Sequence, residues 1–286
     1  MTDPKPTYRW SISVYRGETP FALKPPSAAP LLVAEDVTDI AASFVADPFM
    51  LRRGRLWHMF FEVLRADDGR GEIGHATSRD GSDWQYNRIV LREPFHLSYP
   101  FVFRWKGDTW MIPETLGANA VRLYRAARFP DRWTHEEDLL PIYAADPSVF
   151  RHRSRWWMFV CTTPHTQQTL ALYMADDLRG PWREHPASPI VADDRRIARP
   201  AGRPRRVGGR LIRFAQDCSE IYGKYVRAFE ILELTPDAYR ERELVESPIL
   251  GATGSGWNSH GMHQIDAHHL PDGTWLACVD GKQLEP

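Results

Sequence analysis

The sequence has few of the features that mark several common classes of protein. Its 286 residues include only three cysteines, Cys161, Cys218 and Cys278, which lie far apart in the chain. An odd number at such spacings argues against a disulfide framework or a zinc site. No apolar run approaches the about 20 residues of a membrane span, and the first residues, MTDPKPTYRW, contain no apolar signal region. We therefore expect a soluble, cytoplasmic chain.

An excess of charge and the common catalytic motifs are also missing. The chain has 36 Lys and Arg against 37 Asp and Glu, a formal net charge of −1. A general nucleic-acid binder would carry a basic excess, so we expect no nucleic-acid partner. No Gly-rich phosphate loop, Gly-x-Ser-x-Gly elbow or His-Glu-x-x-His helix occurs. Nucleotide-binding, serine-hydrolase and metalloprotease functions therefore have no support.

What the sequence does contain is a repeat of about 50 residues, with many of its 11 tryptophans at recurring places. Four units open on an X-Pro pair: Asp47-Pro48, Tyr99-Pro100, Asp146-Pro147 and Arg199-Pro200. A strand-like run, a polar turn and further strand-like runs follow each pair. Four short strands per unit, separated by Gly and Pro, predict the blades of a propeller.

We therefore predict an all-β fold, a five-bladed β-propeller in a single domain of residues 1–286. The blades are expected at roughly 44–93, 97–140, 143–190, 196–248 and 260–283. The last unit is short, and strand 8–15 at the amino terminus is predicted to complete it, which would close the ring and remove an exposed sheet edge. The Pro-rich stretch 20–30 is expected to be an extended connector.

The X residues are candidates for a site on the propeller axis. The innermost strand of each blade begins near the mouth of the central channel, so side chains distant in sequence should converge there. These residues are Asp47, Tyr99, Asp146 and Arg199, with Asp266 near the matching place in the fifth unit. Carboxylates brought together shift one another's pKa, which is the usual basis of acid/base work. The alternative for each Asp is a turn cap, which is common before proline.

Further polar residues end apolar strands or lie in loops. Glu114 ends the second strand of its repeat unit. It is either a functional residue or the partner of Arg122 or Arg199 in a salt bridge. Asp217 holds the corresponding place in the fourth unit, and a structural ion pair is its favoured alternative. His263, in a segment rich in histidine, would bind a substrate hydroxyl or carboxylate together with Asp266.

Two aromatic residues and one metal alternative complete the candidate site. Tyr99 and Trp257 are expected in loops or at the channel entrance, where they would stack on the apolar face of a sugar ring. We expect no cofactor. A single metal ion in the channel stays open as an alternative, with His263 as its first ligand.

Several of these segments together resemble a known family. They are Ala46-Asp47-Pro48-Phe49-Met50, Ser98-Tyr99-Pro100-Phe101, Ile112-Pro113-Glu114, Ala198-Arg199-Pro200-Ala201-Gly202 and Trp275-Leu276-Ala277-Cys278-Val279-Asp280-Gly281. The chain is similar to the five-bladed propeller superfamily that contains glycoside hydrolase families 43, 32, 62 and 130. Within it, the chain most resembles the amino-terminal propeller module of plant glucosamine inositolphosphorylceramide transferases and its stand-alone bacterial relatives. The resemblance concerns the propeller alone and implies no transferase activity.

The resemblance implies a glycan site with three acidic residues at the channel mouth. In family 43 these are a general base on the first blade, an orienting Asp on the third and a general-acid Glu on the fourth. Asp47 and Asp146 match the first two. The fourth blade opens on Arg199-Pro200-Ala201-Gly202 and has no Glu there, so Glu114 or Asp217 would take the acid's place. A histidine, as some members use, would bring in His165 or His263.

We predict a glycoside hydrolase that acts on a terminal sugar of an oligosaccharide or glycoconjugate. Asp47 would activate water, Asp146 would orient the sugar, and Glu114 would protonate the leaving oxygen. Arg199 would hold a substrate hydroxyl or carboxylate. One alternative is a non-catalytic glycan- or glycolipid-binding module that works beside a glycosyltransferase. Another is a glycosidic-bond phosphorylase as in family 130, whose phosphate would need a basic pocket formed by Arg199, Arg203, Arg205 and Arg206.

Overall fold

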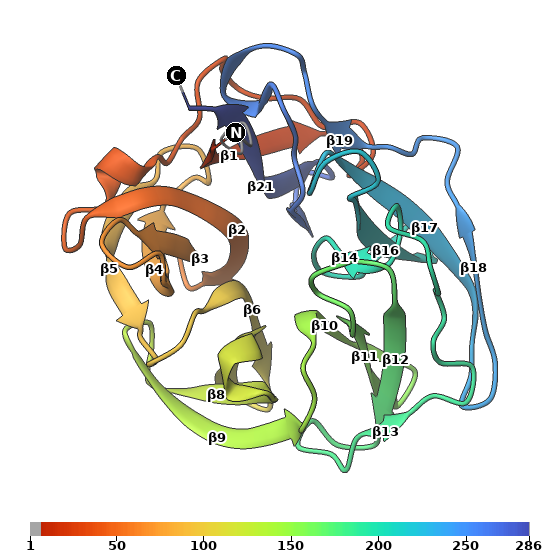
Figure 1. The fold of residues 1–286 in the computed structure, drawn as a ribbon. Coiled ribbons are helices and arrows are strands. Elements are labelled where there is room, and N and C mark those ends of the chain that lie inside the picture. The colour runs from red at the N-terminus through yellow and green to blue at the C-terminus, as the bar shows by residue number, and fades with distance from the viewer. Residues whose placement is uncertain (1–6, 286) are drawn as a thin grey trace, which may run out of the picture.

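Five antiparallel sheets surround one central axis in the computed structural model, which describes residues 7–285 (Figure 1). The only helical segments in that range are three-residue 3-10 turns: η1 (Ala34–Asp36), η2 (Leu116–Ala118) and η3 (Gly256–Asn258). No helical segment there has the length and apolar character needed to cross a membrane. The predicted all-β, five-bladed propeller is confirmed.

The first three blades each have four strands in chain order from the axis outward. Blade 1 consists of β2 (Ala42–Arg53), β3 (Leu56–Arg65), β4 (Gly71–Ser78) and β5 (Gln85–Leu91). Blade 2 consists of β6 (Ser98–Trp105), β7 (Asp108–Glu114), β8 (Val121–Arg128) and β9 (Arg132–Leu140). Blade 3 consists of β10 (Ala145–His152), β11 (Arg155–Cys161), β12 (Leu170–Ala175) and β13 (Arg183–Glu184).

The fourth blade has a divided inner strand. Its pieces β14 (Arg199–Pro200) and β15 (Arg205–Val207) both pair with β16 (Arg210–Asp217). Outside β16 lie β17 (Tyr225–Leu234), β18 (Tyr239–Glu243) and β19 (Leu250–Gly251). The interruption between β14 and β15 allows the chain around Gly202 to approach the next blade, where Gly202 bridges Ile265.

The fifth blade joins the two ends of the chain. It contains β20 (Ile265–His269), β21 (Trp275–Leu284) and, outside them, β1 (Tyr8–Gly17), which pairs with β21 along its whole length. The predicted closure by the amino-terminal strand is therefore confirmed (Figure 1). The Pro-rich stretch is more than a connector, because bridges from Lys24 to Arg16 and from Leu32 to Ile12 border the outer edge of β1.

Packing between blades relies on large apolar side chains that form nearly continuous buried runs along the inner strands, as in β3, β7 and β11. The buried core forms several clusters, each shared by neighbouring blades, and Phe49, Phe101 and Met158 belong to the same one. Tryptophans mark equivalent places in the first three blades: the indole N–H groups of Trp84, Trp133 and Trp182 donate to carbonyls three or four residues earlier in the chain. The recurring tryptophans are thus framework residues.

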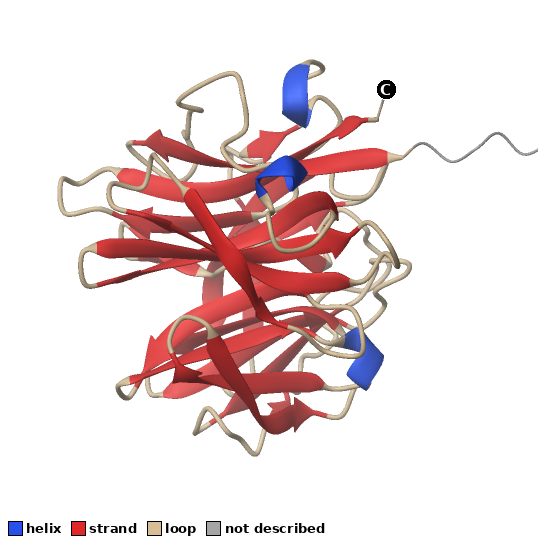
Figure 2. Ribbon diagram, turned by 90° about the vertical axis from the view of Figure 1, so that its left-hand side faces the viewer, coloured by secondary structure: helices blue, strands red, loops and turns tan. Residues whose placement is uncertain are grey.

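The propeller has two distinct ends. We call the end at which the innermost strands begin the mouth, and the opposite end, where they turn back into the second strands, the turn end. In the side view the strands run between these ends, and the carboxyl-terminal label marks the mouth (Figure 2). The X-Pro pairs lie at the start of β6, β10 and β14 and, in blade 1, at a bulge within the first half of β2, so their X residues belong to the mouth.

Candidate functional site

Three of the X-Pro pairs share an unusual backbone. Asp47, Tyr99 and Asp146 have φ values of 52°, 46° and 53°, in the left-handed region that non-glycine residues seldom adopt. Each lies in a β-bulge, because the register shifts between Ala46 and Phe49 in blade 1 and at the equivalent points of blades 2 and 3. Strained bulges of this kind turn a side chain away from the regular strand direction. Arg199, in contrast, pairs in regular register with Gln216.

At the mouth, Arg199 joins two carboxylates from different blades. Its Nε donates to Asp146 Oδ2 at 2.6 Å, and its Nη2 lies 3.3 Å from Glu114 Oε2. Gln216 Nε2 donates to the same Asp146 oxygen at 2.8 Å. All four side chains are buried. Asp146 is therefore held in place by two donors, whereas Glu114 has only the longer contact with Arg199.

Asp47 belongs to a second group with His263 and Asp280. The Asp47 backbone N–H donates to Asp280 Oδ2 at 2.9 Å, and His263 Nδ1 lies 2.8 Å from Asp280 Oδ1. His263 Nε2 is 3.7 Å from Asp47 Oδ1. Trp10 stacks on the His263 ring at a centroid distance of 3.9 Å and fixes its plane. The side chain of Asp47 contacts no Lys or Arg of residues 7–285.

Burial and crowding raise the pKa of two of these carboxyl groups. The pKa of Asp47 lies well above its ordinary value, first because the group is buried and then because Glu62, Asp146 and other carboxylates surround it. Burial, followed by the charge of Asp146, raises the pKa of Glu114 to about 8, although Arg199 opposes the shift. Burial therefore favours the protonated form of both groups, and the two carboxyls compete for protons in one crowded site.

The structure adds acidic residues that sequence reasoning did not select. Glu62 lies opposite Ala46 in blade 1, the place that Glu114 occupies opposite Ser98 in blade 2. This equivalence was the available signal for Glu62. Asp280 ends the apolar run of β21 in the same way that Glu114 ends β7, so its position at a strand end was the signal there.

A histidine lies next to Glu62 at this end. His96 Nε2 is 3.2 Å from Glu62 Oε1, and Gly71 N–H donates to its Nδ1 at 2.9 Å. Burial lowers the pKa of His96, but the interaction with Glu62 outweighs burial and raises it to about 8. In this arrangement Nδ1 is the acceptor and Nε2 carries the ring proton that points to Glu62, so a second proton on the ring would cost the bond from Gly71.

Tyr99 and Asp266 are not placed as the sequence suggested. The Tyr99 ring is fully buried, and its hydroxyl lies 2.7 Å from Ser148 Oγ and accepts a 2.7 Å hydrogen bond from Gly202 N–H. It connects three blades and presents no face for stacking. Asp266 accepts from Arg203 at 2.8 Å and from the Met50 N–H at 2.9 Å, so it links blades deeper along β2. Asp280 supplies the fifth blade's carboxylate at the mouth instead.

Asp217 and Trp257 also lie outside the cluster. Asp217 accepts from Arg227 Nε at 2.8 Å and from Ser219 Oγ, which is the structural pairing considered from the sequence. Trp257 is buried against Gly281 and lines a depression between blades 4 and 5 with Tyr15. Arg227 on β17 holds Asp217, and β21 covers Trp257, so neither side chain belongs to the group of carboxylates at the mouth.

The arginines considered for a phosphate have other partners. Arg203 and Arg205 both bind Asp266, at 2.8 and 3.3 Å, and Arg206 Nη2 lies 2.8 Å from His152 Nδ1. Arg199 is shared between Asp146 and Glu114. The basic pocket that a phosphorylase would need is therefore not formed by these four residues.

Asp47, His263 and Asp280 could hold a metal ion, since one ligand atom of each lies within 4.8 Å of the others. Two carboxylates and an imidazole are a plausible donor set for several divalent ions. Asp280 already accepts from the backbone N–H groups of Asp47, His263 and Gln264 and faces the His263 ring. The group is thus held together by its own hydrogen bonds, and metal binding there stays a prediction.

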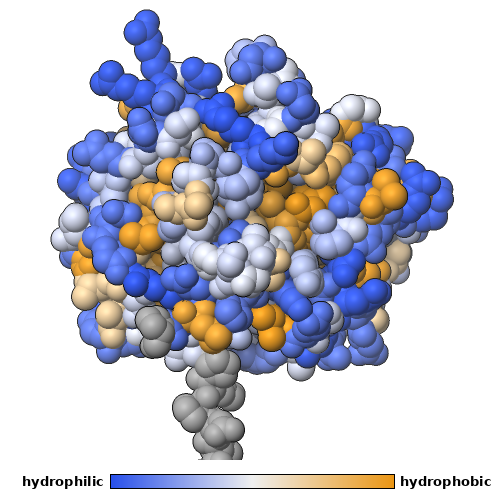
Figure 3. Space-filling view, turned by 90° about the horizontal axis from the view of Figure 1, so that it is seen from above, coloured by the Kyte–Doolittle hydropathy of each residue, from blue (hydrophilic) through white to orange (hydrophobic). Residues whose placement is uncertain are grey.

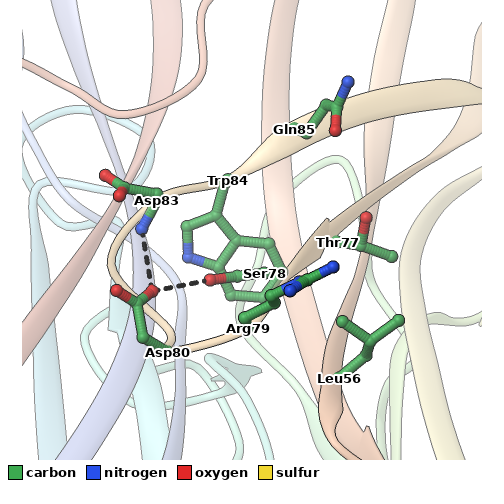
Figure 4. A pocket seen from close by; sticks show the side chains of 8 residues that line it. All are labelled: Leu56, Thr77, Ser78, Arg79, Asp80, Asp83, Trp84 and Gln85. Carbon is green, nitrogen blue, oxygen red and sulfur yellow. Dashed lines mark hydrogen bonds between the residues drawn. The ribbon is translucent and has the colours of Figure 1, made fainter.

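A depression of about 580 Å³ lies at the turn end of blade 1 (Figure 4). Of its two acidic residues, Asp80 and Asp83, the first accepts from the N–H groups of Ser82 and Asp83 and from Ser78 Oγ. These bonds cap the loop before Trp84. The Asp80 carboxylate is therefore committed to the turn, and the mouth is the better candidate for acid/base chemistry.

Comparison with known proteins finds relatives in sequence and neighbours in fold. A glucosamine inositolphosphorylceramide transferase 1 from Oryza sativa subsp. japonica is 35% identical across 96% of this chain, which spans 40% of that relative's length. Among solved structures, the β-1,2-mannobiose phosphorylase of Listeria innocua has a TM-score of 0.66 at 13% identity, covering 94% of this chain and 96% of that one. The catalytic domain of a family 62 α-L-arabinofuranosidase from Coprinopsis cinerea has a TM-score of 0.63 at 11% identity, covering 96% and 97%.

At these identities the solved structures establish the propeller fold alone. The family evidence is stronger and comes from sequence. Residues 3–282 match the family model described as glucosamine inositolphosphorylceramide transferase 1, N-terminal. Together with the relative that is 35% identical, this match shows that the chain belongs to the family of that amino-terminal propeller module.

Proposed function

We propose that the mouth binds a terminal sugar of an oligosaccharide or glycoconjugate and that Glu114 and Asp47 cleave its glycosidic bond. The observation that carries the proposal is the convergence of the buried carboxyl groups of Asp47, Asp146 and Glu114 at the mouth, whose burial and mutual repulsion raise the pKa of Glu114 and favour its protonated form. A general acid must hold such a proton until the leaving oxygen takes it. Lone buried carboxyl groups are costly, so a cluster of them suggests a function.

Asp47 is the proposed base because its carboxylate has no Arg or Lys partner among residues 7–285 and, unlike Asp280, it does not accept three backbone N–H groups. Its raised pKa and that of Glu114 arise in one crowded group, so the two carboxyls titrate together. In the reactive form the proton resides on Glu114, and Asp47 is charged and takes a proton from water. The Tyr99 N–H, 3.3 Å from Asp47 Oδ2, supports that charge.

Asp146 and Arg199 have a positioning role in this proposal. Asp146 is held by Arg199 and Gln216 and cannot move toward a sugar without losing both bonds. Its charge helps to keep the proton on Glu114. Arg199 takes the place where the resemblance to family 43 leads one to expect a Glu. Its Nε and Nη2 bond to Asp146 and Glu114, and its Nη1 donates to Pro164 O, so the second N–H of Nη1 would bind a sugar hydroxyl.

The test is hydrolysis of a panel of 4-nitrophenyl glycosides and reduced oligosaccharides by the wild type, Glu114→Gln and Asp47→Asn. We expect each substitution to lower the rate about 10²- to 10⁴-fold. Glu233→Gln is the matched control, because Glu233 is exposed on the outer part of blade 4. Hydrolysis that survives both mouth substitutions at the control's level would remove these residues from the mechanism.

A second candidate, a non-catalytic glycan-binding module, is favoured by the position of Arg199. The guanidinium binds both Asp146 and Glu114, which would also suit a rigid recognition site. The curated relatives are named as transferases and are longer than this chain, so a module beside a glycosyltransferase is a coherent alternative. Saturable sugar binding without release of product would select it.

The cytoplasmic location expected from the sequence stays a prediction.

A further inference from the structure

The turn end of the propeller concentrates positive charge in a chain that is nearly neutral. The innermost turns of the five blades are residues 52–55, 104–108, 151–155, 206–210 and 269–273. They contain ten Arg or Lys and two Asp, whereas the whole chain has 36 basic and 37 acidic residues. We call these five turns the basic end. Four of the five blades contribute to its charge.

Most of this charge is exposed and has no acidic partner. Lys106 lies 3.4 Å from Asp177, and Arg155 lies 3.0 Å from Asp176. The other eight make no ion pair with a carboxylate of residues 7–285, and all are exposed: Arg52, Arg53, Arg55, Arg104, Arg151, Arg153, Arg206 and Arg210. A surface with such an excess of one charge repels itself, so it gains from a polyanionic partner.

Aromatic rings support several of these guanidinium groups from below. Arg53 lies over Phe129 at 4.6 Å, Arg151 over Trp105 at 4.5 Å and Arg210 over Phe21 at 5.7 Å from the ring centroids. Stacking restricts the long side chains without neutralising them. The charges are therefore held at the surface in defined positions, ready for phosphate oxygens.

The shape of this end narrows the choice of partner. The turns surround the axis and project from the end opposite the mouth, at the left in Figure 2. In the space-filling view the loops that project at the top, which is the turn end, are strongly hydrophilic (Figure 3). A flat, extended partner can contact all five turns at once. The backbone of a nucleic acid can contact only the turns that lie along one line.

We propose that the basic end docks on the anionic headgroup surface of a lipid bilayer. Among the exposed large apolar side chains of residues 7–285, only Leu56 adjoins these turns, so attraction comes from charge and not from apolar insertion. Each basic residue close to an anionic leaflet strengthens binding about fivefold, and salt weakens it. Docked in this way, the mouth faces away from the bilayer. The inference goes beyond the proposed function and does not depend on it.

The test is co-sedimentation of the protein with phosphatidylcholine vesicles, alone or containing phosphatidylserine or phosphatidylglycerol. The variant is Arg55→Glu/Arg153→Glu, because neither side chain makes a hydrogen bond or ion pair that the fold would lose. The matched control is Arg88→Glu/Arg195→Glu, which makes the same change in charge on strand β5 and in the loop before β14. Circular dichroism verifies that both doubles fold.

The wild type should bind both kinds of anionic vesicle, ignore phosphatidylcholine alone and be released by salt. The Arg55→Glu/Arg153→Glu variant should bind at least about tenfold more weakly, and the control should bind nearly as the wild type does. Equal losses in the two doubles would overturn the proposal. So would a wild type that binds RNA or an acidic polypeptide but neither anionic vesicle.

Discussion

The two ends of the propeller carry opposite charge in opposite surroundings. At the mouth, five carboxyl groups are buried around a single deep guanidinium, that of Arg199. At the turn end, eight arginines face solvent. Nearly equal numbers of acidic and basic residues in the chain therefore say little about where in the molecule their charges act. Because the carboxyl groups at the mouth are buried, their charges shift one another's pKa and affect the stability of the fold. The arginines of the basic end are exposed, so their charge acts only on binding partners.

Removal of Arg199 at the mouth should change the free energy of unfolding far more than removal of an arginine at the basic end. Arg199→Met leaves Asp146 and Glu114 buried without their cation, which should lower the free energy of unfolding by about 3–5 kcal/mol. Arg153→Met at the basic end should change it by less than about 0.5 kcal/mol. Urea unfolding at neutral pH measures both. Similar losses in the two variants would erase the distinction between the ends.

The pH dependence of stability should give the next largest effect. The pKa of Glu114 is about 8 in the folded chain against an ordinary 4.5, so the folded state holds this proton more tightly than the unfolded state. This carboxyl therefore makes the wild type less stable as pH rises from about 4.5 to 8. In Glu114→Gln the free energy of unfolding should not show this part of the decline with pH, which amounts to a few kcal/mol.

Unfolding midpoints at pH 5 and pH 8 measure this difference, with Glu233→Gln as the exposed control. The stability of Glu114→Gln relative to the wild type should be higher at pH 8 than at pH 5. The control should show the same relative stability at both values. A Glu114→Gln variant that follows the wild type across this range would mean that Glu114 is already ionised in the folded chain.

The smallest effect is expected at the basic end. Arg55→Glu/Arg153→Glu should leave the free energy of unfolding within about 0.5 kcal/mol of the wild type, because exposed charges away from buried contacts contribute little. Salt should hardly alter that difference. A loss above about 2 kcal/mol would show that these arginines hold the fold together, contrary to the comparison.

The sequence was sufficient to predict the ring and its opening strands. The 50-residue repeat of X-Pro pairs and tryptophans depends on strand period and turn chemistry, both of which are local. Asp47, Asp146, Glu114, Arg199 and His263 do lie together at the mouth. Their convergence follows from the symmetry of blades, which a repeat in the sequence already implies.

The direction of individual side chains could not be predicted in the same way. Tyr99 occupies the place in blade 2 that Asp47 occupies in blade 1, at an equivalent bulge. Its longer side chain nevertheless reaches across to Ser148 and Gly202. Asp266 and Asp280 are both in the fifth blade, and only contacts between blades decide that Asp280 faces Asp47. Such contacts are distant in sequence and depend on the closed ring.

Crystals of the protein soaked with a panel of monosaccharides, including arabinose, xylose, mannose and glucosamine, would show whether the mouth binds a sugar. We expect a sugar ring at the mouth, with oxygens within hydrogen-bond distance of Asp47 and Glu114 and a hydroxyl on Arg199. A sugar bound only elsewhere on the propeller, or an unchanged mouth after every soak, would contradict this expectation.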